Sequence, residues 1–175
     1  MLKKIALTIL VLICAVLAYA ATKPDTLTVQ RTATIKAPPE KIYPLITDFH
    51  SWSAWSPYDK MDPAMKRSYG GAASGRGAVY AWEGNSKVGK GRMEIAEATP
   101  PSRVAIDLHF LKPMKSDNQA EFTLVPRGES TTVTWTMRGP NVYIGKVMGV
   151  FVNMDHMIGR DFETGLANLK AIDEK

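Results

Sequence analysis

The chain has 175 residues, 45% of which are hydrophobic, and it carries 22 basic and 17 acidic residues. The length suits one domain with at most a short appendage, and the apolar content is that of a packed domain, which excludes a disordered chain. Two of the basic residues, Lys3 and Lys4, lie at the extreme N-terminus, so the remainder is only weakly basic and no nucleic-acid partner is expected.

Residues 1–21 have the features of a secretory signal peptide or an N-terminal membrane anchor. The two lysines precede an apolar run from Ile5 to Ala21, in which the triplet Ala18-Tyr19-Ala20 fits a cleavage site. Cleavage would release a secreted protein, whereas retention would leave one anchor at the short limit of what spans a bilayer. Because the positive end stays inside in both cases, we expect an extracytoplasmic (periplasmic) domain, either secreted or tethered to the inner membrane by residues 5–21.

The single cysteine, Cys14, lies within this apolar run. The rest of the chain has no thiol, which excludes disulfides, zinc–thiolate sites and cysteine nucleophiles there. Ile13 stands where a lipoprotein signal requires a small residue, so we do not expect lipidation. Residues 22–26 are predicted to be a short polar linker, and residues 27–175 a single ligand-binding domain.

Residues 27–36 alternate between apolar and polar side chains, with many β-branched residues, which predicts a first β-strand ended by Ala37-Pro38-Pro39. A short helix is predicted from about Glu40, where Pro44 is close enough to the first turn to be tolerated. Its apolar face, at helical spacing, consists of Ile42, Leu45, Ile46 and Phe49.

A second short helix is expected around Trp52 and Trp55. Their three-residue spacing places both indoles on the same face of one helical turn, which Pro57 ends. Asp59 and Asp62 follow on a predicted loop near the expected cavity entrance, where they are candidates for acid–base work.

Six further segments alternate at strand spacing and are separated by turn residues, which is typical of an antiparallel meander. They cover residues 65–69, 79–83, 89–97, 104–110, 120–125 and 133–138. A glycine-rich loop, residues 70–77, joins the first two of them. It is not expected to bind phosphate, because no helix follows it and the lysine-serine or lysine-threonine ending of phosphate loops is missing.

Residues 145–173 are predicted to form one long C-terminal helix, because apolar residues keep helical spacing and no proline interrupts them. Gly149, Gly159 and Gly165 each lower the helix propensity by about 1 kcal/mol. We therefore expect this helix to be stabilised by burial of its apolar face against a large surface.

Together these elements predict an α+β domain with a curved antiparallel sheet of six to seven strands, whose apolar face is covered by the C-terminal helix. The twist of such a sheet leaves a space beneath the helix, and bulky side chains on the two facing surfaces either line a pocket there or pack as core. The residues expected to line this space or its entrance are Trp52, Trp55, Tyr58, Tyr80, Trp82, Met93, Leu108, Phe110, Phe122, Trp135, Met148, Phe151, Met154 and Phe162.

The order of the elements resembles that of the START/Bet v 1-like superfamily (SRPBCC), and in particular its bacterial polyketide cyclase/dehydrase and lipid transport family. The matching stretches are residues 32–43, 48–57 and 77–85, together with the glycine-rich loop and the long final helix. The resemblance implies a helix-grip (Bet v 1-like) fold with two short helices after the first strand and a long C-terminal helix over the sheet. It also implies a hydrophobic small molecule or lipid as the ligand, and it places the glycine-rich loop near the cavity entrance.

Few side chains indicate catalysis or metal binding. His50, His109 and His156 are far apart in the sequence, and no serine lies in a nucleophile motif, so we predict no catalytic residue, no metal site and no cofactor. Basic residues cluster at two predicted hairpin ends, where they are either solvated or in contact with anionic lipid headgroups. These basic residues are Lys87, Lys90, Arg92, Lys112 and Lys115.

We therefore expect an exported, non-enzymatic domain that binds a hydrophobic small molecule or lipid between the sheet and the C-terminal helix, with membrane association through the N-terminal segment. The first alternative is an enzyme of the polyketide cyclase or dehydratase kind, which requires an acidic or basic side chain inside the cavity. The second alternative is an interaction domain with a fully packed core and no ligand.

Overall fold

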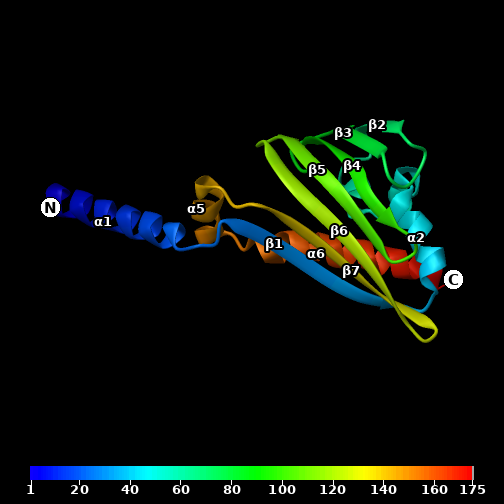
Figure 1. Cartoon of the computed structure of the whole chain (residues 1–175). Coiled ribbons are helices and arrows are strands. Elements are labelled where there is room, and N and C mark those ends of the chain that lie inside the picture. Colours follow the sequence, from blue (N-terminus) through cyan, green and yellow to red (C-terminus); the bar gives the residue numbers. More distant parts are fainter. Residues whose placement is uncertain (175) are drawn as a thin grey trace.

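The computed structural model describes residues 1–174 (Figure 1). Seven antiparallel strands form one curved sheet in the order β1-β7-β6-β5-β4-β3-β2. The strands are β1 (Thr26–Ile35), β2 (Lys66–Gly71), β3 (Ala78–Glu83), β4 (Lys90–Thr99), β5 (Arg103–Lys112), β6 (Ser116–Arg127) and β7 (Ser130–Pro140). The predicted antiparallel sheet of six to seven strands is therefore confirmed, with seven strands.

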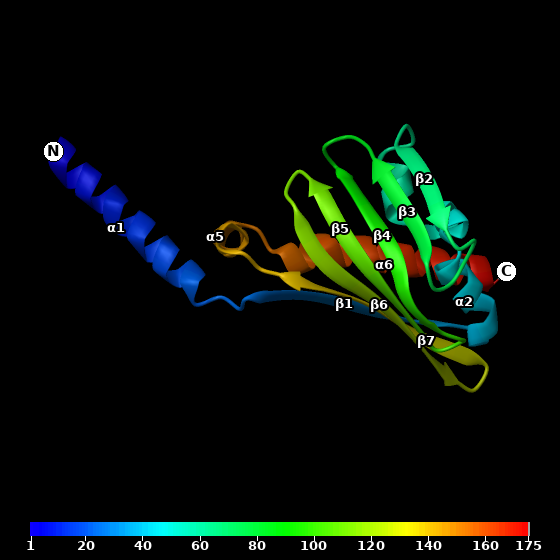
Figure 2. The same cartoon turned by 45° about the horizontal axis from the view of Figure 1, so that its top comes forward.

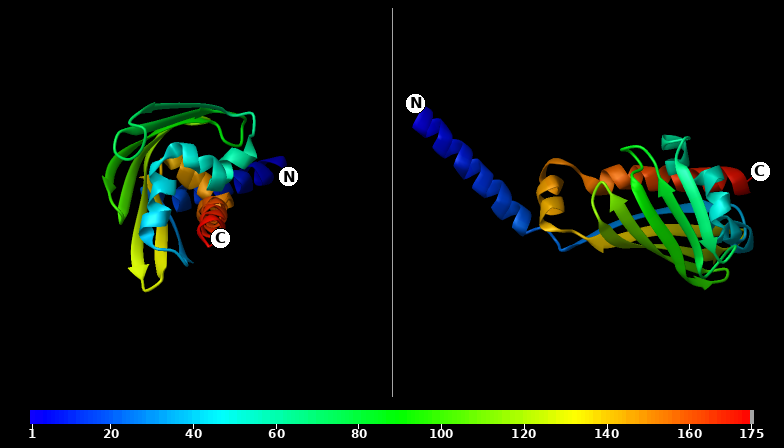
Figure 3. Two further views of the ribbon diagram at one scale, coloured as in Figure 1. Left: turned by 90° about the vertical axis from the view of Figure 1, so that its right-hand side faces the viewer. Right: turned by 90° about the horizontal axis from the view of Figure 1, so that it is seen from above.

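The helices follow the predicted order. They are α1 (Leu2–Ala21), α2 (Pro39–Thr47), the 3-10 turn η1 (Phe49–Ser51), α3 (Trp52–Trp55), α4 (Pro57–Met61), α5 (Tyr143–Phe151) and α6 (Met154–Asp173). An end-on view shows the sheet curling around α6 and around the helices that connect β1 to β2 (Figure 3). This arrangement is the helix-grip α+β fold that the sequence predicts.

The connectivity explains why α6 lies where it does. Strands β2 to β7 are consecutive neighbours, and β1 closes the sheet by pairing with β7, as in the register pair Val29 and Met137. The chain therefore leaves β7 at the edge next to β1, and α6 returns across the concave face of the sheet (Figure 2). Alternate residues of β1 and of β3 to β7 point to this concave face, and they form the sheet's part of the buried core.

The long C-terminal helix is confirmed as α6, but it begins at Met154 and not near Gly145 as predicted. Val152 and Asn153 have extended backbone angles and separate α6 from the shorter helix α5. The Asn153 side chain accepts a hydrogen bond from the N–H of His156 (2.9 Å), so it caps α6 as asparagine commonly does. The apolar spacing continues through the break, which is why the sequence pattern alone predicts one helix.

Two details around the short helices also differ from the prediction. Pro57 does not simply end the tryptophan turn, because it is the first residue of α4, where its missing N–H removes no helical hydrogen bond. Asp59 consequently lies in α4 and not in a loop. Pro44 lies in the second turn of α2, since that helix begins at Pro39.

A layer of aromatic rings fills the space between the sheet and α6. Trp135 of β7 stacks on Phe162 of α6 with ring centroids 4.0 Å apart, and on Phe122 of β6 at 4.9 Å. Trp55 is fully buried, and its ring meets Trp135 edge to face at 5.6 Å. These contacts bury large ring areas against one another, which stabilises the sheet–helix interface.

Hydrogen bonds fix the two tryptophans of α3 to the preceding helix. The indole Nε1 of Trp52 donates to the carbonyl oxygen of Ile46, and that of Trp55 donates to the carbonyl oxygen of Leu45, both at 2.9 Å. The tight turn through η1 is what brings these rings back under α2. The indole N–H of Trp135 has no acceptor among residues 1–174.

Helix α1 extends away from the sheet and is long and apolar enough to cross a membrane (Figures 1 and 2). Its C-terminal end contacts α5. The Tyr143 hydroxyl of α5 donates to the carbonyl oxygen of Leu17 (3.0 Å), and Ala20 is fully buried. Next to this contact, Lys146 Nζ lies 2.5 Å from a carboxylate oxygen of Asp25.

Candidate functional site

The fourteen side chains predicted to line the cavity fall into three groups. Eight are buried in the ring layer and the sheet face beneath it: Trp52, Trp55, Tyr80, Trp82, Met93, Phe122, Trp135 and Phe162. Four are partly exposed at the margin of that layer: Tyr58, Leu108, Phe110 and Met154. Met148 and Phe151, on α5, are exposed by 46% and 74% and lie outside the space between sheet and α6, because the break at Asn153 turns α5 away.

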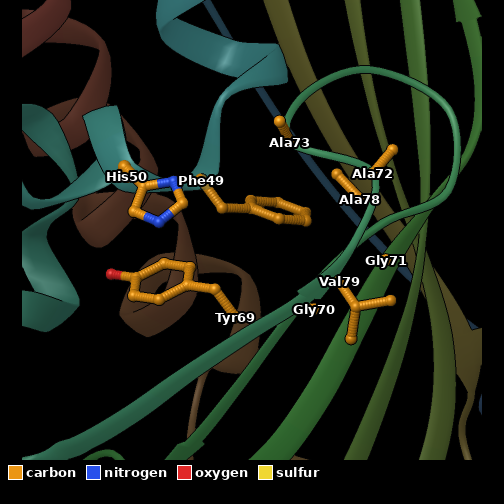
Figure 4. A pocket seen from close by; sticks show the side chains of 9 residues that line it. All are labelled: Phe49, His50, Tyr69, Gly70, Gly71, Ala72, Ala73, Ala78 and Val79. Atoms are coloured by element: carbon orange, nitrogen blue, oxygen red, sulfur yellow. The ribbon is translucent and has the colours of Figure 1, made fainter.

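A pocket of about 210 Å³ lies at the edge of the ring layer, between η1 and the glycine-rich hairpin that joins β2 and β3 (Figure 4). It is lined by Phe49, His50, Tyr69, Gly70, Gly71, Ala72, Ala73, Ala78 and Val79. None of the fourteen predicted residues forms its wall. The glycine-rich loop, which the family resemblance places near a cavity entrance, does form part of it.

The glycine-rich hairpin is held in place by backbone hydrogen bonds. The N–H of Gly75 donates to the carbonyl oxygen of Thr47 in α2 (3.0 Å), and the N–H of Gly77 donates to that of Ile95 in β4 (2.8 Å). Gly71 has a positive φ of 69°, and a Cβ there would lie 2.0 Å from the carbonyl oxygen of Gly77. Glycine is therefore required for this wall of the pocket to close.

The opposite wall consists of aromatic side chains. Phe49 is 2% exposed and meets Trp52 edge to face at 5.3 Å and Tyr80 at 5.9 Å, so the pocket floor is continuous with the ring layer. At the rim, the imidazole of His50 stacks on the ring of Tyr69, with centroids 4.0 Å apart and planes 19° from parallel (Figure 4). The pocket thus offers an apolar floor and a stacked, partly polar rim.

The rim also carries a pair formed by a carboxylate and an imidazole. Asp48 Oδ1 accepts a hydrogen bond from the backbone N–H of His50 (2.9 Å) and lies 3.0 Å from the His50 Nδ1 atom. Desolvation alone would raise the pKa of Asp48, but the hydrogen bonds from His50 and Ser51 lower it below the ordinary value. The ionised carboxylate therefore orients the imidazole through Nδ1, and Nε2 is the ring nitrogen not paired with Asp48.

The two tyrosines next to the pocket remain protonated at neutral pH. Burial raises the pKa of Tyr69 and of Tyr80, and the negative charge of Asp59 raises both further. Asp59 itself is paired with Arg67, whose Nε lies 2.5 Å from its Oδ1. Asp59 is therefore part of a structural ion pair between α4 and β2 and does not line the pocket.

Asp62, the other acidic candidate of this region, has a structural role. It is 8% exposed, and its carboxylate accepts hydrogen bonds from the N–H groups of Asn85 (2.7 Å) and Ala64 (3.2 Å). Burial also raises the pKa of Asp161 in α6, and burial together with the charge of Asp161 raises that of Tyr58 in α4. These groups lie between α4 and α6, away from the pocket wall.

A second hollow, of about 470 Å³, lies at the tips of two hairpins. Its walls are Glu83, Gly84, Asn85, Ser86, Gly89, Lys90, Lys112 and Pro113. Two of the predicted basic residues meet here, but Lys90 Nζ is already paired with Glu83 at 2.9 Å. In residues 1–174 no group of three or more His, Cys, Asp or Glu side chains is placed to hold a metal ion.

The sequence profile of the family described as polyketide cyclase/dehydrase and lipid transport matches residues 26–172. No curated protein matches the chain. Among solved structures, protein CV1439 from Chromobacterium violaceum is similar, with a TM-score of 0.61 at 17% identity, over 87% of this chain and 99% of that one. The Aha1 dimer from Colwellia psychrerythraea gives a TM-score of 0.56 at 19% identity, over 85% of this chain and 96% of that one.

A di-domain ARO/CYC protein, BexL of the BE-7585A biosynthetic pathway, gives a TM-score of 0.62 at 12% identity over 90% of this chain. The match covers 53% of BexL, so this chain spans about half the length of that protein. These likenesses show the fold. With the family profile matched from the first strand almost to the end of α6, the chain belongs to the polyketide cyclase/dehydrase and lipid transport family.

Proposed function

We propose that this protein is an extracytoplasmic binding module that holds a small apolar molecule in the pocket between η1 and the glycine-rich hairpin. The observation that carries the proposal is the pocket of about 210 Å³ whose floor is Phe49 and whose rim is the His50–Tyr69 stack. Typical sites for drug-sized ligands measure about 300–1,000 Å³, so this one suits a molecule of about one or two rings, or one end of a longer chain. The family description, which includes lipid transport, supports an apolar ligand.

The proposed site lies at the edge of the ring layer, whereas the sequence pattern predicts a site between the sheet and α6. The apolar faces of the sheet and of α6 do meet, but the rings of Phe122, Trp135 and Phe162 stack between them at 4.0–4.9 Å. A ligand between those faces would have to separate stacked rings, which costs the contact energy of a packed core. A ligand in the edge pocket contacts Phe49 without separating them.

A pocket-filling variant tests the site. Ala78 is 2% exposed and lies on the pocket wall, so Ala78→Leu places three further carbon atoms in the space of the ligand. We expect the variant to bind 2-naphthol, a fluorophore of two rings, roughly tenfold more weakly or worse, since a clash of about 1.4 kcal/mol already has that effect. The measurement is a fluorescence titration, with native mass spectrometry of the purified chain to identify any retained molecule.

The matched control is Ala81→Leu, because Ala81 lies on the same strand but on its opposite, partly exposed face. This variant should bind like the unmodified chain. Equal binding by both variants would place the site elsewhere, and the absence of binding and of any retained molecule in the unmodified chain would contradict the function itself.

We also infer that α1 is retained as a membrane anchor. Its last turns are part of the folded domain, since Ala20 is fully buried and Leu17 accepts the hydrogen bond from Tyr143. Cleavage after Ala20 would remove these contacts. The intact mass of the protein recovered from the membrane fraction should therefore include residues 1–20, whereas a soluble form beginning at Ala21 would contradict retention.

A second candidate function, proton transfer on a bound substrate, is favoured by the Asp48–His50 pair at the pocket rim. An imidazole oriented by an ionised carboxylate can act as a general base toward a ligand in the pocket. If it does, a ligand recovered after incubation in D₂O should carry deuterium at an acidic carbon. His50→Gln should abolish this exchange while the ligand is still retained, and a ligand without deuterium would rule the activity out.

A further inference from the structure

Helix α5 carries its apolar side chains outward and its charge inward, which is the reverse of a helix that faces water. Phe151, Ile144 and Tyr143 are exposed by 74%, 54% and 50%. Lys146, the one charged residue of α5, is 9% exposed, and its Nζ is paired with Asp25. An exposed surface of this kind indicates a partner that is itself apolar.

We define the α5 surface as the exposed apolar residues of this helix and its two flanking positions. They are Val142, Tyr143, Ile144, Met148, Phe151 and Val152. The surface is continuous with that of α1, because the Tyr143 hydroxyl reaches the carbonyl oxygen of Leu17 in α1. Whatever surrounds the last turns of α1 therefore also reaches the α5 surface.

The dimensions of α1 place that contact at the boundary of a bilayer. A helix of 20 residues is about 30 Å long, which equals the thickness of the hydrocarbon core. Leu17 then lies near the extracytoplasmic end of the core, and α5 lies at the level of the headgroups and upper acyl chains. Tyr19 and Tyr143, exposed by 57% and 50%, are residues typical of this level.

The hairpin tip between β5 and β6 points to the same end of the domain as α5 (Figures 1 and 2). It exposes Leu111 and Met114 by 43% and 51%, and the exposed Lys112 and Lys115 alternate with them. Apolar side chains flanked by lysines suit an anionic lipid surface. The tip is therefore a second point at which this end of the domain is fitted to a membrane.

We propose that α5 is an interfacial helix that seats the domain on the extracytoplasmic leaflet of the membrane spanned by α1, with the β5–β6 tip as a second contact. The proposal rests on the proposed retention of α1. Its consequence is that the domain is held in one orientation at the lipid surface and does not rotate freely about its tether.

The test uses the full chain in phosphatidylcholine–phosphatidylglycerol vesicles, with and without bromine on the acyl chains, and an NBD fluorophore on a single cysteine. The native Cys14 reports insertion of α1. Cys14→Ser combined with Phe151→Cys reports the α5 surface. Cys14→Ser combined with Val125→Cys is the control, because Val125 is also apolar and 44% exposed but lies near the β6–β7 turn at the far end of the sheet (Figure 1).

We expect brominated lipid to quench the label at positions 14 and 151 several-fold more strongly than at position 125, with near-ultraviolet circular dichroism showing the aromatic core intact in all three proteins. A quenched label at position 14 with an unquenched label at 151 would overturn the membrane seat and leave the anchor in place. An unquenched label at position 14 would contradict both the retention of α1 as an anchor and the membrane contact of α5. A third outcome is blue-shifted emission at position 151 that is not quenched by brominated lipid but increases with the protein density in the membrane. This result would assign the α5 surface to a contact with a second copy of the chain, and it would also overturn the proposal.

Discussion

A Cβ atom at Gly165 would lie 2.8 Å from Cζ3 of Trp135, closer than side chains pack, so this glycine sets how near α6 comes to the ring layer. Gly159 has a similar role, since a Cβ there would lie 1.9 Å from the Arg31 Nη2 atom. Gly149 differs, because nothing lies within 4 Å of its Cβ position. From the sequence all three glycines show only a cost in helix propensity, whereas the structure gives two of them a packing reason.

Replacing these glycines by alanine should therefore have opposite effects. Gly149→Ala should stabilise the protein by up to about 1 kcal/mol through helix propensity. Gly165→Ala gains the same stabilisation from helix propensity but forces the stacked ring of Trp135 to move, which typically costs about 1–3 kcal/mol. A net loss of stability is therefore expected. Thermal unfolding of the two variants measures this, and equal shifts in the same direction would contradict the packing argument.

At the scale of elements, α6 is attached to β1 by a polar contact at the margin of the core. The Arg31 guanidinium on β1 reaches Glu163 through Nε (2.7 Å) and Asp155 through Nη2 (3.1 Å), both on α6. The hydrogen bond from Arg31 lowers the pKa of Asp155 below its ordinary value of 3.8, although desolvation opposes it. A carboxylate with a lowered folded-state pKa stabilises the fold above its unfolded-state pKa and loses this contribution as the pH falls.

Arg31→Met should consequently lower the melting temperature most at neutral pH. The difference from the unmodified chain should shrink as the pH falls from about 3.8 through the lower folded-state pKa of Asp155. Arg160→Met is the matched control, because Arg160 is an exposed arginine on α6, the helix that carries Asp155. A difference that is independent of pH would show that Arg31 acts by packing alone.

Elements with a regular period were predictable, and irregular ones were not. Alternation of period two located the strands, including β7 with Val133, Trp135 and Met137 on its buried face. The break between α5 and α6 escaped prediction, since apolar spacing continues across Asn153 and only its capping role marks a helix start. As a result Phe151 was assigned to a buried face and lies on the surface.

For the molecule as a whole, the sequence predicted the fold but not the location of the pocket. Aromatic residues on one face look the same in sequence whether they line a cavity or stack on one another, and packing in three dimensions decides between the two. The pocket wall is built largely from alanine and glycine, which carry no periodic signal. The one available indication was the glycine-rich loop itself, and it gained meaning only from the family resemblance.

The central claim is that an apolar ligand occupies the edge pocket and leaves the ring layer between sheet and α6 closed. The most direct measurement is a ¹H–¹⁵N NMR titration of the full chain in nanodiscs with 2-naphthol, a molecule of two rings. We predict shifted amide signals at Phe49 and His50 and along residues 69–79, which surround the pocket. Shifts centred instead on Trp135 of β7 and Phe162 of α6, or no shifts at all, would contradict the account.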